Sequence, residues 1–431
     1  MKEYKKYAKE MLEFIEKSPS CFHVIDNIRT NLTEEGFQEL KENQEWKLSW
    51  GKGYFVIRND SSVTAFRLPK REQALGFHIV AAHSDSPTFK LKEEAQIQVE
   101  ERYVKLNTEK YGGMILSTWL DRALSVAGRV AVRDEKTGKI MTKLVNIDKD
   151  LLVIPNVAIH MNREMNKGVE YNPQTDMLPL FADKTESKGR SSLQNMAAKA
   201  AGVKAEDILG QDLFLYVRER GRLLGENGEF VLSPKLDDLQ CVYAAIKAFT
   251  ESTSEDYINV CTIFDNEEVG SGTRQGADST FLEDTLRRIA GGLSESEDRY
   301  LQWVADSFMI SADNAHAVHP NHPEKADPTN RPYLNGGIVI KYHGSQKYTT
   351  DAVSAAYMKN LCRQAEVPYQ TYANRSDILG GSTLGNISTA HVSVACVDIG
   401  LPQLAMHSAV ETAGLKDTAY AVKALRVFFS A

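Results

Sequence analysis

Three carboxylates lie within four residues, directly after an apolar run in the second half of the chain. The run spans residues 258–264, and Asp265, Glu267 and Glu268 follow it. Neighbouring acids at the end of a buried strand repel one another and lose hydration, which raises their pKa values, whereas a bound cation favours the ionised forms. A solvated turn is the ordinary explanation for such a cluster when it stands alone. Its position after a buried run favours one half of a metal site.

Four other apolar runs also end on side chains that can bind a metal ion. Their ends carry, in chain order, His83 and Asp85, Asp237 and Asp238, Asp313 and His316, and His407. In an open α/β sheet the carboxyl ends of the parallel strands meet at one edge, where ligands bind. Residues that are far apart in the sequence are therefore expected to converge on one point.

Five of these side chains form a candidate ligand set for two divalent metal ions. They are His83, Asp237, Glu268, Asp313 and His407. Two ions bring four positive charges and the three carboxylates bring three negative ones, so a hydroxide between the ions would cancel the remaining charge. Imidazole and carboxylate ligands without thiolate are compatible with Zn²⁺ and also suit Mn²⁺ or Co²⁺. Asp85, two residues after His83, is expected to hold the imidazole tautomer.

Glu267 is the neighbour of a candidate ligand and is left without a ligand role. Side chains of adjacent residues diverge, so Glu268 can bind metal while Glu267 faces a metal-bound water. Glu267 is therefore the candidate general base, a role that typically contributes about 10²–10⁴-fold to a rate.

The composition argues against several other classes of protein. The net charge of -7 and the pI near 5.9 disfavour a nucleic-acid partner, because such proteins need a basic face. No run approaches the roughly 18–20 apolar residues of a membrane helix. The five cysteines are odd in number and lie among apolar neighbours, which is typical of reduced thiols in a cytoplasmic protein.

The order of the expected elements indicates an α/β fold with an insertion. In residues 1–92 and 233–431, buried strands alternate with helices, which predicts a mainly parallel sheet with helices on both faces. In residues 93–232, short strands alternate with period two, which predicts an inserted, mostly β, barrel-like domain. We further expect a strand at residues 391–397 and a loop at residues 183–190.

Five motifs resemble, in the same order, those of the aspartyl-aminopeptidase family of dinuclear zinc exopeptidases. The motifs are HSDSP (83–87), LDDL (236–239), DNEEVGS (265–271), SADNAHAVHPN (311–321) and MHS (406–408). The segments TWLDR (118–122) and IPNVAIH (154–160) extend the resemblance into the insertion. The resemblance therefore covers nearly the whole chain.

The resemblance implies specific roles and an activity. Asp237 would bridge two metal ions, His83 and Asp313 would complete one site, and Glu268 and His407 the other. Glu267 would take a proton from the bridging water, so that the metals and this base hydrolyse the first peptide bond of a peptide substrate. The resemblance also implies a homododecamer in which the insertion makes the dimer contact.

Four further residues are candidates for contacts with the substrate. His160 resembles a family histidine that enters the active site of a neighbouring subunit. Lys341 resembles a family lysine that meets an acidic side chain, which predicts a preference for N-terminal Asp or Glu, with neutral residues as the alternative. His316 and His319 follow Asp313 and could contact a metal-binding side chain or the oxyanion of the substrate. Outside a site, such residues are structural histidines or solvated lysines.

Other functions fit the sequence less well. The loop at residues 270–276 follows a strand and contains glycines, but its spacing differs from the dinucleotide fingerprint and the adjacent carboxylates would repel a phosphate. Glycosidases need two carboxylates that flank a substrate, which neighbouring acids in one loop do not provide readily. A metal-stabilised assembly protein without catalysis would have no use for Glu267 beside a full ligand set.

Overall fold

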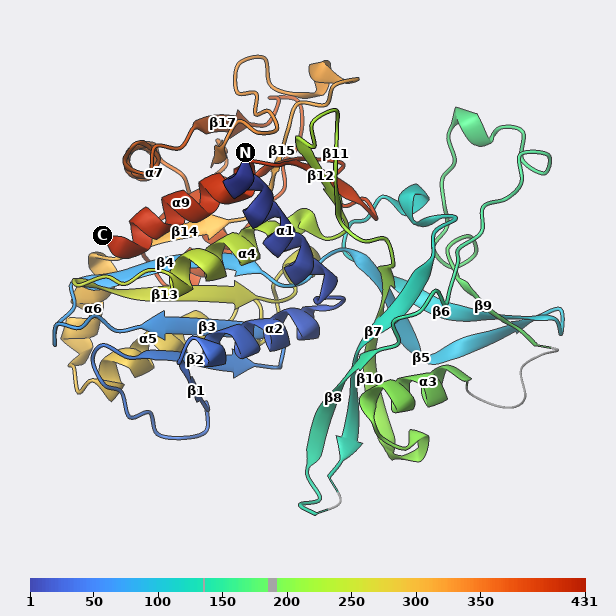
Figure 1. Ribbon diagram of the computed structural model, residues 1–431, viewed down its shortest axis with the longest axis horizontal. Coiled ribbons are helices and arrows are strands. Elements are labelled where there is room, and N and C mark those ends of the chain that lie inside the picture. Colours follow the sequence, from blue (N-terminus) through green and yellow to red (C-terminus); the bar gives the residue numbers. More distant parts are fainter. Residues whose placement is uncertain (135, 185–191) are drawn as a thin grey trace.

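The computed structural model describes residues 1–134, 136–184 and 192–431. Within these ranges, nine strands form the largest sheet, in the order β1-β2-β3-β13-β4-β14-β18-β16-β17 (Figure 1). The strands are, in that order, β1 (Gln38–Leu40), β2 (Gly53–Arg58), β3 (Ser62–Arg67), β13 (Tyr257–Phe264), β4 (Gly76–His83), β14 (Phe308–Ala312), β18 (Ala395–Gly400), β16 (Ile338–Tyr342) and β17 (Tyr369–Ala373). The central strands β13, β4, β14 and β18 run parallel. The predicted α/β fold is confirmed.

Helices cover both faces of this sheet. One face packs against α1 (Lys2–Glu16), α2 (Cys21–Glu34), α4 (Leu236–Thr250), α7 (Ala352–Gln364) and α9 (Asp417–Ser430). The other face packs against α5 (Phe281–Gly292), α6 (Glu297–Ala305) and α8 (Leu384–His391). Strand β4 supplies Val80 and Ala82 to the first core and Ile79 and Ala81 to the second, as a strand covered on both sides must.

The register of the central strands brings their carboxyl ends to one edge. His83 at the end of β4 pairs with Phe264 at the end of β13. Ser311, two residues before Asp313, pairs with Ala81 of β4. The backbone hydrogen bonds of this register therefore place the residues that follow β13 and β14 beside His83.

A second sheet of six strands has the order β8-β7-β10-β5-β6-β9 in the described part of the chain. Its strands are β5 (Thr88–Val99), β6 (Tyr103–Tyr111), β7 (Leu124–Arg133), β8 (Ile140–Asn146), β9 (Leu180–Asp183) and β10 (Ile208–Val217). All neighbouring pairs are antiparallel. Leu152 bridges to Leu124 of β7 and Val153 bridges to Leu180 of β9, so the sheet curls towards a barrel. The helix α3 (Ser192–Ala201) completes its core.

A third sheet joins the two parts of the chain. It contains β11 (Arg222–Leu224), β12 (Phe230–Ser233), β20 (Glu411–Gly414), β19 (Pro402–Leu404) and β15 (Ala315–His316). Strand β12 pairs antiparallel with β20, so the chain returns from the second sheet directly beside residues near the C-terminus. None of the helices in the described ranges is long and apolar enough to cross a membrane.

Two expected strands differ in the structure, and one expected loop lies mostly outside the described residues. The strand expected at residues 391–397 is displaced: α8 ends at His391 and β18 begins at Ala395, because Val392 and Val394 pack into the second core beside the helix. The run before Asp237 is not one strand, since β12 ends at Ser233 and α4 begins at Leu236. Most of the loop expected at residues 183–190 lies outside the described residues.

Candidate metal centre

Asp237 lies between two histidines from opposite ends of the sequence. One carboxylate oxygen, Oδ1, lies 3.5 Å from Nε2 of His83, and the other, Oδ2, lies 3.6 Å from Nε2 of His407. Both are longer than a hydrogen bond and leave room for an ion between the atoms. Asp237 is therefore placed to serve two positions at once.

The remaining candidate ligands flank these two positions. Asp313 Oδ1 lies 3.9 Å from His83 Nε2, and Glu268 Oε2 lies 3.3 Å from His407 Nε2. The structure thus brings all five predicted ligands together. Two groups whose ligand atoms lie within 4.8 Å of one another share Asp237: His83, Asp237, Asp238 and Asp313, and Asp237, Glu268 and His407.

The donor atoms of this cluster fit a pair of divalent cations. Oδ1 of Asp237 is buried and has no hydrogen-bond partner, which is costly for a carboxylate oxygen unless a cation is present. Nitrogen and oxygen ligands in this combination suit zinc. A third group joins His83 to Glu267 and Glu268, so the predicted base lies beside the predicted ligands.

Different local structures place these ligands. His83 is the last residue of β4, Asp313 directly follows β14, and Glu267 and Glu268 lie in a short 3₁₀ helix after β13. Asp237 instead lies at the start of α4, where the preceding Lys235 has the left-handed φ of 57°. His407 has a φ of 65° in the loop after β19. These two positions depend on turns rather than on strand ends.

Asp85 holds several parts of the centre in place. Its carboxylate accepts the backbone N–H groups of Glu267 and Glu268, each at 3.1 Å, and the hydroxyl of Tyr111 at 2.8 Å. Its Oδ1 lies 3.4 Å from Nδ1 of His83, and its backbone oxygen lies 3.1 Å from the same nitrogen. Asp85 thus orients both the imidazole and the loop of the two glutamates. Tyr111, from the second sheet, was missed because its role depends on a long-range contact.

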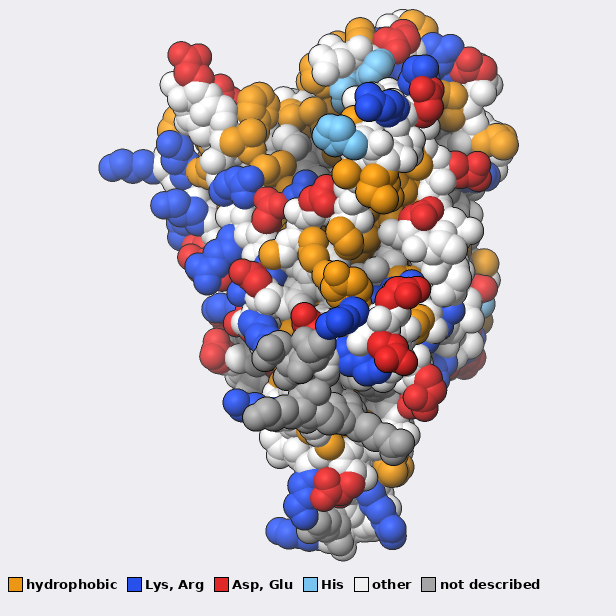
Figure 2. Space-filling view, turned by 90° about the vertical axis from the view of Figure 1, so that its right-hand side faces the viewer, with side chains coloured by type: hydrophobic (Ala, Val, Ile, Leu, Met, Phe, Trp, Pro, Cys, Tyr) orange, Lys and Arg blue, Asp and Glu red, His pale blue; other side chains and the backbone are white. Residues whose placement is uncertain are grey.

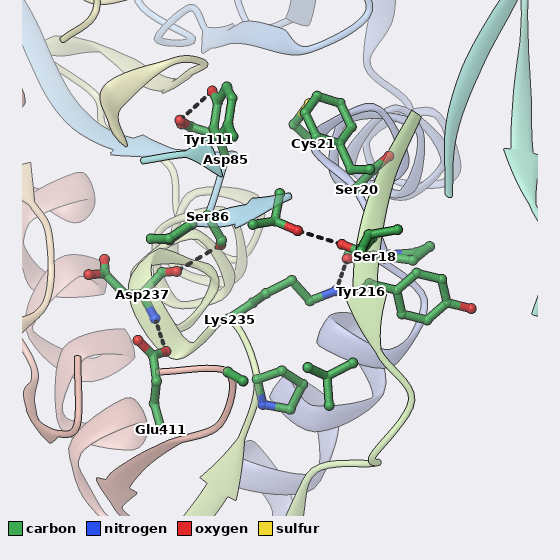
Figure 3. A pocket seen from close by; sticks show the side chains of 18 of the residues that line it. Ser18, Ser20, Cys21, Asp85, Ser86, Tyr111, Tyr216, Lys235, Asp237 and Glu411 are labelled. Atoms are coloured by element: carbon green, nitrogen blue, oxygen red, sulfur yellow. Dashed lines mark hydrogen bonds between the residues drawn. The ribbon is translucent and has the colours of Figure 1, made fainter. Parts of the chain in front are cut away.

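Glu411 and Ser86 hold the backbone of Asp237 (Figure 3). Glu411 accepts the backbone N–H of Asp237 at 3.0 Å, and the hydroxyl of Ser86 donates to the backbone oxygen of Asp237 at 2.8 Å. These residues line a narrow cavity of about 50 Å³ that also contains Lys235. Sequence reasoning did not identify Glu411, because a glutamate four residues after a histidine has no special signature.

The electrostatics of the centre are those of crowded buried acids. Burial raises the pKa values of Glu267 and Glu411 to about 8, and it also raises the pKa of Glu268. Burial also acts against ionisation of Asp237, but the imidazoles of His407 and His83 outweigh it and lower the pKa of Asp237. Bound cations would favour the ionised carboxylates throughout this cluster.

A cavity of about 320 Å³ opens beside the cluster. Its lining includes the proposed base and three ligands together with residues from the neighbouring strands and loops: Asp237, Glu267, Asp313, Asn314, Ala315, His316, Lys341, Tyr348, Tyr372, Gly381, Ser382, Thr383, Met406 and His407. Lys341 is only 2% exposed, and its ammonium lies 3.6 Å from Asp313 and 5.4 Å from the ring centre of Tyr348. Lys341 is therefore a buried part of the cavity wall and not a solvated surface lysine.

Two of the predicted substrate contacts lie away from this cavity within the chain. His160 is exposed in the loop between β8 and β9. His319 is exposed too, and its Nδ1 accepts the backbone N–H of Asn321 at 3.2 Å. Neither residue contributes to the cavity lining, whereas His316 does.

A mainly parallel sheet that gathers imidazoles and carboxylates around a shared aspartate, with a free glutamate beside them, defines a metallohydrolase. Residues 14–429 match the sequence model of the family described as Aminopeptidase I zinc metalloprotease (M18). The chain belongs to the M18 family of zinc aminopeptidases. The predicted family, the hydrolytic aminopeptidase activity and zinc as the metal are confirmed.

Full-length relatives agree with this assignment. The chain is 48% identical to the probable M18 family aminopeptidase 2 of Clostridium novyi over 100% of both chains. It is 39% identical to the protein of the same name from Pseudomonas savastanoi pv. phaseolicola over 97% of both chains.

Solved structures agree in fold. A chain from the complex of Ape4 and Nbr1 superposes with a TM-score of 0.95 at 37% identity, covering 99% of this chain and 86% of that one. The mApe1 dodecamer of S. cerevisiae superposes with a TM-score of 0.85 at 28% identity, covering 99% and 97%.

Proposed function

We propose that the predicted residues carry the aminopeptidase activity in the roles assigned from the sequence. His83 and Asp313 would hold one zinc ion, Glu268 and His407 the other, and Asp237 both. The observation that carries this proposal is the position of Asp237, whose two oxygens face different histidines at 3.5 and 3.6 Å. Two histidines that each face a different oxygen of one carboxylate fit two ion positions that share Asp237.

Glu267 is the proposed proton carrier. The zinc ions that these residues would hold would supply polarisation of the scissile carbonyl and a lower pKa for the attacking water. Glu267 takes the proton of that water and returns it to the leaving amine. Burial raises the pKa of Glu267, and bound cations would favour its ionised form, which is the form that accepts a proton. Asp85 supports this step because it fixes the backbone N–H groups of Glu267 and Glu268.

The exopeptidase specificity is proposed to follow from charge and size. A free substrate α-ammonium group is attracted by the carboxylates of Glu267 and Glu268, whereas an internal peptide segment has no such charge. The cavity of about 320 Å³ accommodates a terminal residue and leaves little room for a chain on both sides.

Lys341 is proposed to favour acidic N-terminal residues. Its buried ammonium lines the cavity and would attract a carboxylate of the substrate. This attraction is local, because the chain as a whole has a net charge of -7. The alternative is a preference for neutral residues, since Asp313 already lies 3.6 Å from this ammonium. His316, in the same lining, is the proposed contact for the substrate oxyanion, and the role of His319 stays a prediction.

The chain is proposed to form a homo-oligomer, and specifically a dodecamer built from dimers. The similar mApe1 of S. cerevisiae is a dodecamer. The loop between β8 and β9 carries the exposed apolar residues Val157 (52%), Ile159 (46%) and Met161 (81%), which surround His160. Figure 2 shows hydrophobic side chains grouped on the face that carries the second sheet. Association would cover them and carry His160 into the active site of a neighbouring subunit.

The domain division and the cellular location remain proposals. Residues 1–92 and 233–431 would form the catalytic domain and residues 93–232 the inserted domain, a division supported by the separate core of the second sheet. The cytoplasmic location rests on the cysteines, which are free in the described structure.

A panel of aminoacyl chromogenic substrates tests the proposed roles and specificity together. The apo protein is reconstituted with Zn²⁺, Mn²⁺ or Co²⁺ alone and assayed with Asp, Glu, Ala and Leu substrates. We expect the fastest release from Asp or Glu substrates, and Lys341→Ala should lower that preference about tenfold or more. An unchanged ratio of acidic to neutral substrates in Lys341→Ala would remove Lys341 from the proposal.

A further inference from the structure

Asp398 is a buried acid that takes no part in the metal cluster. It is 1% exposed and lies on β18, between β14, which leads to Asp313, and β16, which carries Lys341. Asp398 pairs with Ser311 of β14, and the next residue, Ile399, pairs with Ile340 of β16. A charge so deeply buried is costly unless hydrogen bonds satisfy it.

The carboxylate of Asp398 joins two separate segments of the chain. Its Oδ2 accepts the backbone N–H of Thr349 at 2.6 Å and the hydroxyl of the same residue at 2.7 Å. Its Oδ1 accepts the hydroxyl of Thr383 at 2.6 Å. The backbone N–H of Asp398 also donates to the hydroxyl of Thr350 at 2.9 Å. One side chain thus holds the segment before α7 and the segment before α8.

These two segments contribute to the cavity wall and contain no proposed metal ligand. Tyr348, Gly381, Ser382 and Thr383 all belong to the cavity lining. Tyr348 directly precedes Thr349, and its ring lies 5.4 Å from the ammonium of Lys341. The hydrogen bonds to Asp398 therefore determine where this wall stands relative to Lys341.

The packing around the carboxylate leaves it little freedom. A Cβ at Gly385 would lie 2.6 Å from Oδ1 of Asp398, so the first turn of α8 can approach the carboxylate only because residue 385 is glycine. The surroundings of Asp398 also affect the charge of the Lys341 ammonium. Burial opposes its charge, but Asp313, Tyr348 and Asp398 outweigh burial and raise the pKa of Lys341.

We propose that Asp398 is a positioning residue for substrate selection. By holding Thr349 and Thr383, it fixes the subsite beside Lys341 that receives the side chain of the N-terminal residue. This inference rests on the proposed function, in which that side chain enters the cavity. It predicts that loss of these contacts changes which N-terminal residues are accepted, while zinc binding and proton transfer by Glu267 are retained.

The variants Thr349→Val and Thr383→Val each remove one hydroxyl donor to Asp398. Thr389→Val is the matched control, because this hydroxyl lies on α8 and donates to the backbone oxygen of Gly385 at 2.9 Å, with no contact to Asp398. Asp398→Ala removes all side-chain contacts, and the threonine variants keep the test valid if that protein does not fold. Each protein is measured for zinc content, melting temperature, and kcat and KM on the four aminoacyl substrates.

We expect the Thr349 and Thr383 variants to raise KM about tenfold for the preferred substrate, with kcat changed less than about twofold and normal zinc content. The ratio of kcat/KM among substrates should change in both variants and stay constant in Thr389→Val. Unchanged ratios, with only a lower melting temperature, would show that Asp398 is merely structural, and loss of zinc would overturn the proposal too. Failure of the wild-type protein to cleave any substrate would instead contradict the proposed function.

Discussion

The carboxylate of Glu411 accepts the backbone N–H of His407 at 2.8 Å. Its other oxygen accepts the backbone N–H of Asp237 at 3.0 Å. One side chain on β20 therefore fixes the backbone of two proposed ligands that are 170 positions apart in the sequence. The separation of 3.6 Å between their side chains depends on a residue that is not itself a proposed ligand.

Replacing Glu411 by Gln should weaken zinc binding about 10–100-fold, the usual cost of losing a partner that orients a ligand. An amide nitrogen cannot accept an N–H group, so one of the two backbone contacts must be lost. Competition with a chelator of known affinity measures the effect. Glu226→Gln, at an exposed position, is the control, and equal zinc affinity in both variants would contradict the role of Glu411.

Replacing Glu267 by Gln should preserve the zinc content and lower kcat by about 10²–10⁴-fold. The amide has nearly the same shape but cannot accept a proton from water. Steady-state kinetics and metal analysis on the same sample test this expectation. Retained turnover would exclude Glu267 as the base, whereas lost zinc would make it a ligand.

Removal of zinc should destabilise the protein as well as inactivate it. Without cations, Glu267 and Glu268 would be left as buried acids whose pKa values are raised by burial. A ligand that binds only the folded state at a hundred times its Kd contributes about 2.7 kcal/mol. The melting temperature should fall in a chelator and recover with added zinc. A chelator-treated protein that loses activity but melts at the same temperature would contradict this prediction.

His78 should make the free energy of unfolding depend on pH between about 4 and 6.5. It is 3% exposed, stacked on Tyr257 at 3.8 Å and beside Phe428 at 4.5 Å, and burial lowers its pKa from 6.5 to about 4. In this window the unfolded chain binds more protons than the native state, so stability rises with pH, by up to about 3 kcal/mol across it.

The variant His78→Phe keeps the ring stacking and cannot titrate, so it should lose this part of the pH dependence. Denaturant unfolding of both proteins at a series of pH values measures it. The difference between variant and wild type removes the contribution of the metal cluster, which is common to both. Parallel pH profiles for the two proteins would show that His78 has no such effect.

Much of the centre was predictable because parallel strands end at one edge of a sheet. His83 ends a buried strand, Asp313 and the glutamates at 267 and 268 follow buried strands, and the strand register places them together. Asp237 was expected at the end of a strand. It lies instead in the first turn of α4, just after the left-handed residue Lys235.

The supporting residues were not predictable in the same way. Glu411, Tyr111 and Asp398 act through hydrogen bonds to partners far away in the sequence. No spacing rule links such pairs, because their contacts form only when the chain has folded. The displaced strand near residue 391 has a similar cause: alternating valines pack as well beside a helix as in a strand.

Only residues 84–87 separate His83 at the end of β4 from Thr88 at the start of β5. This short connection contains Asp85 and ties the two sheets together at His83, a proposed zinc ligand. A rotation of the second sheet would pull on that histidine at once, because so short a tether cannot absorb it. If subunits associate through the second sheet, a shift of that sheet on assembly would reach a proposed zinc ligand through only these four residues.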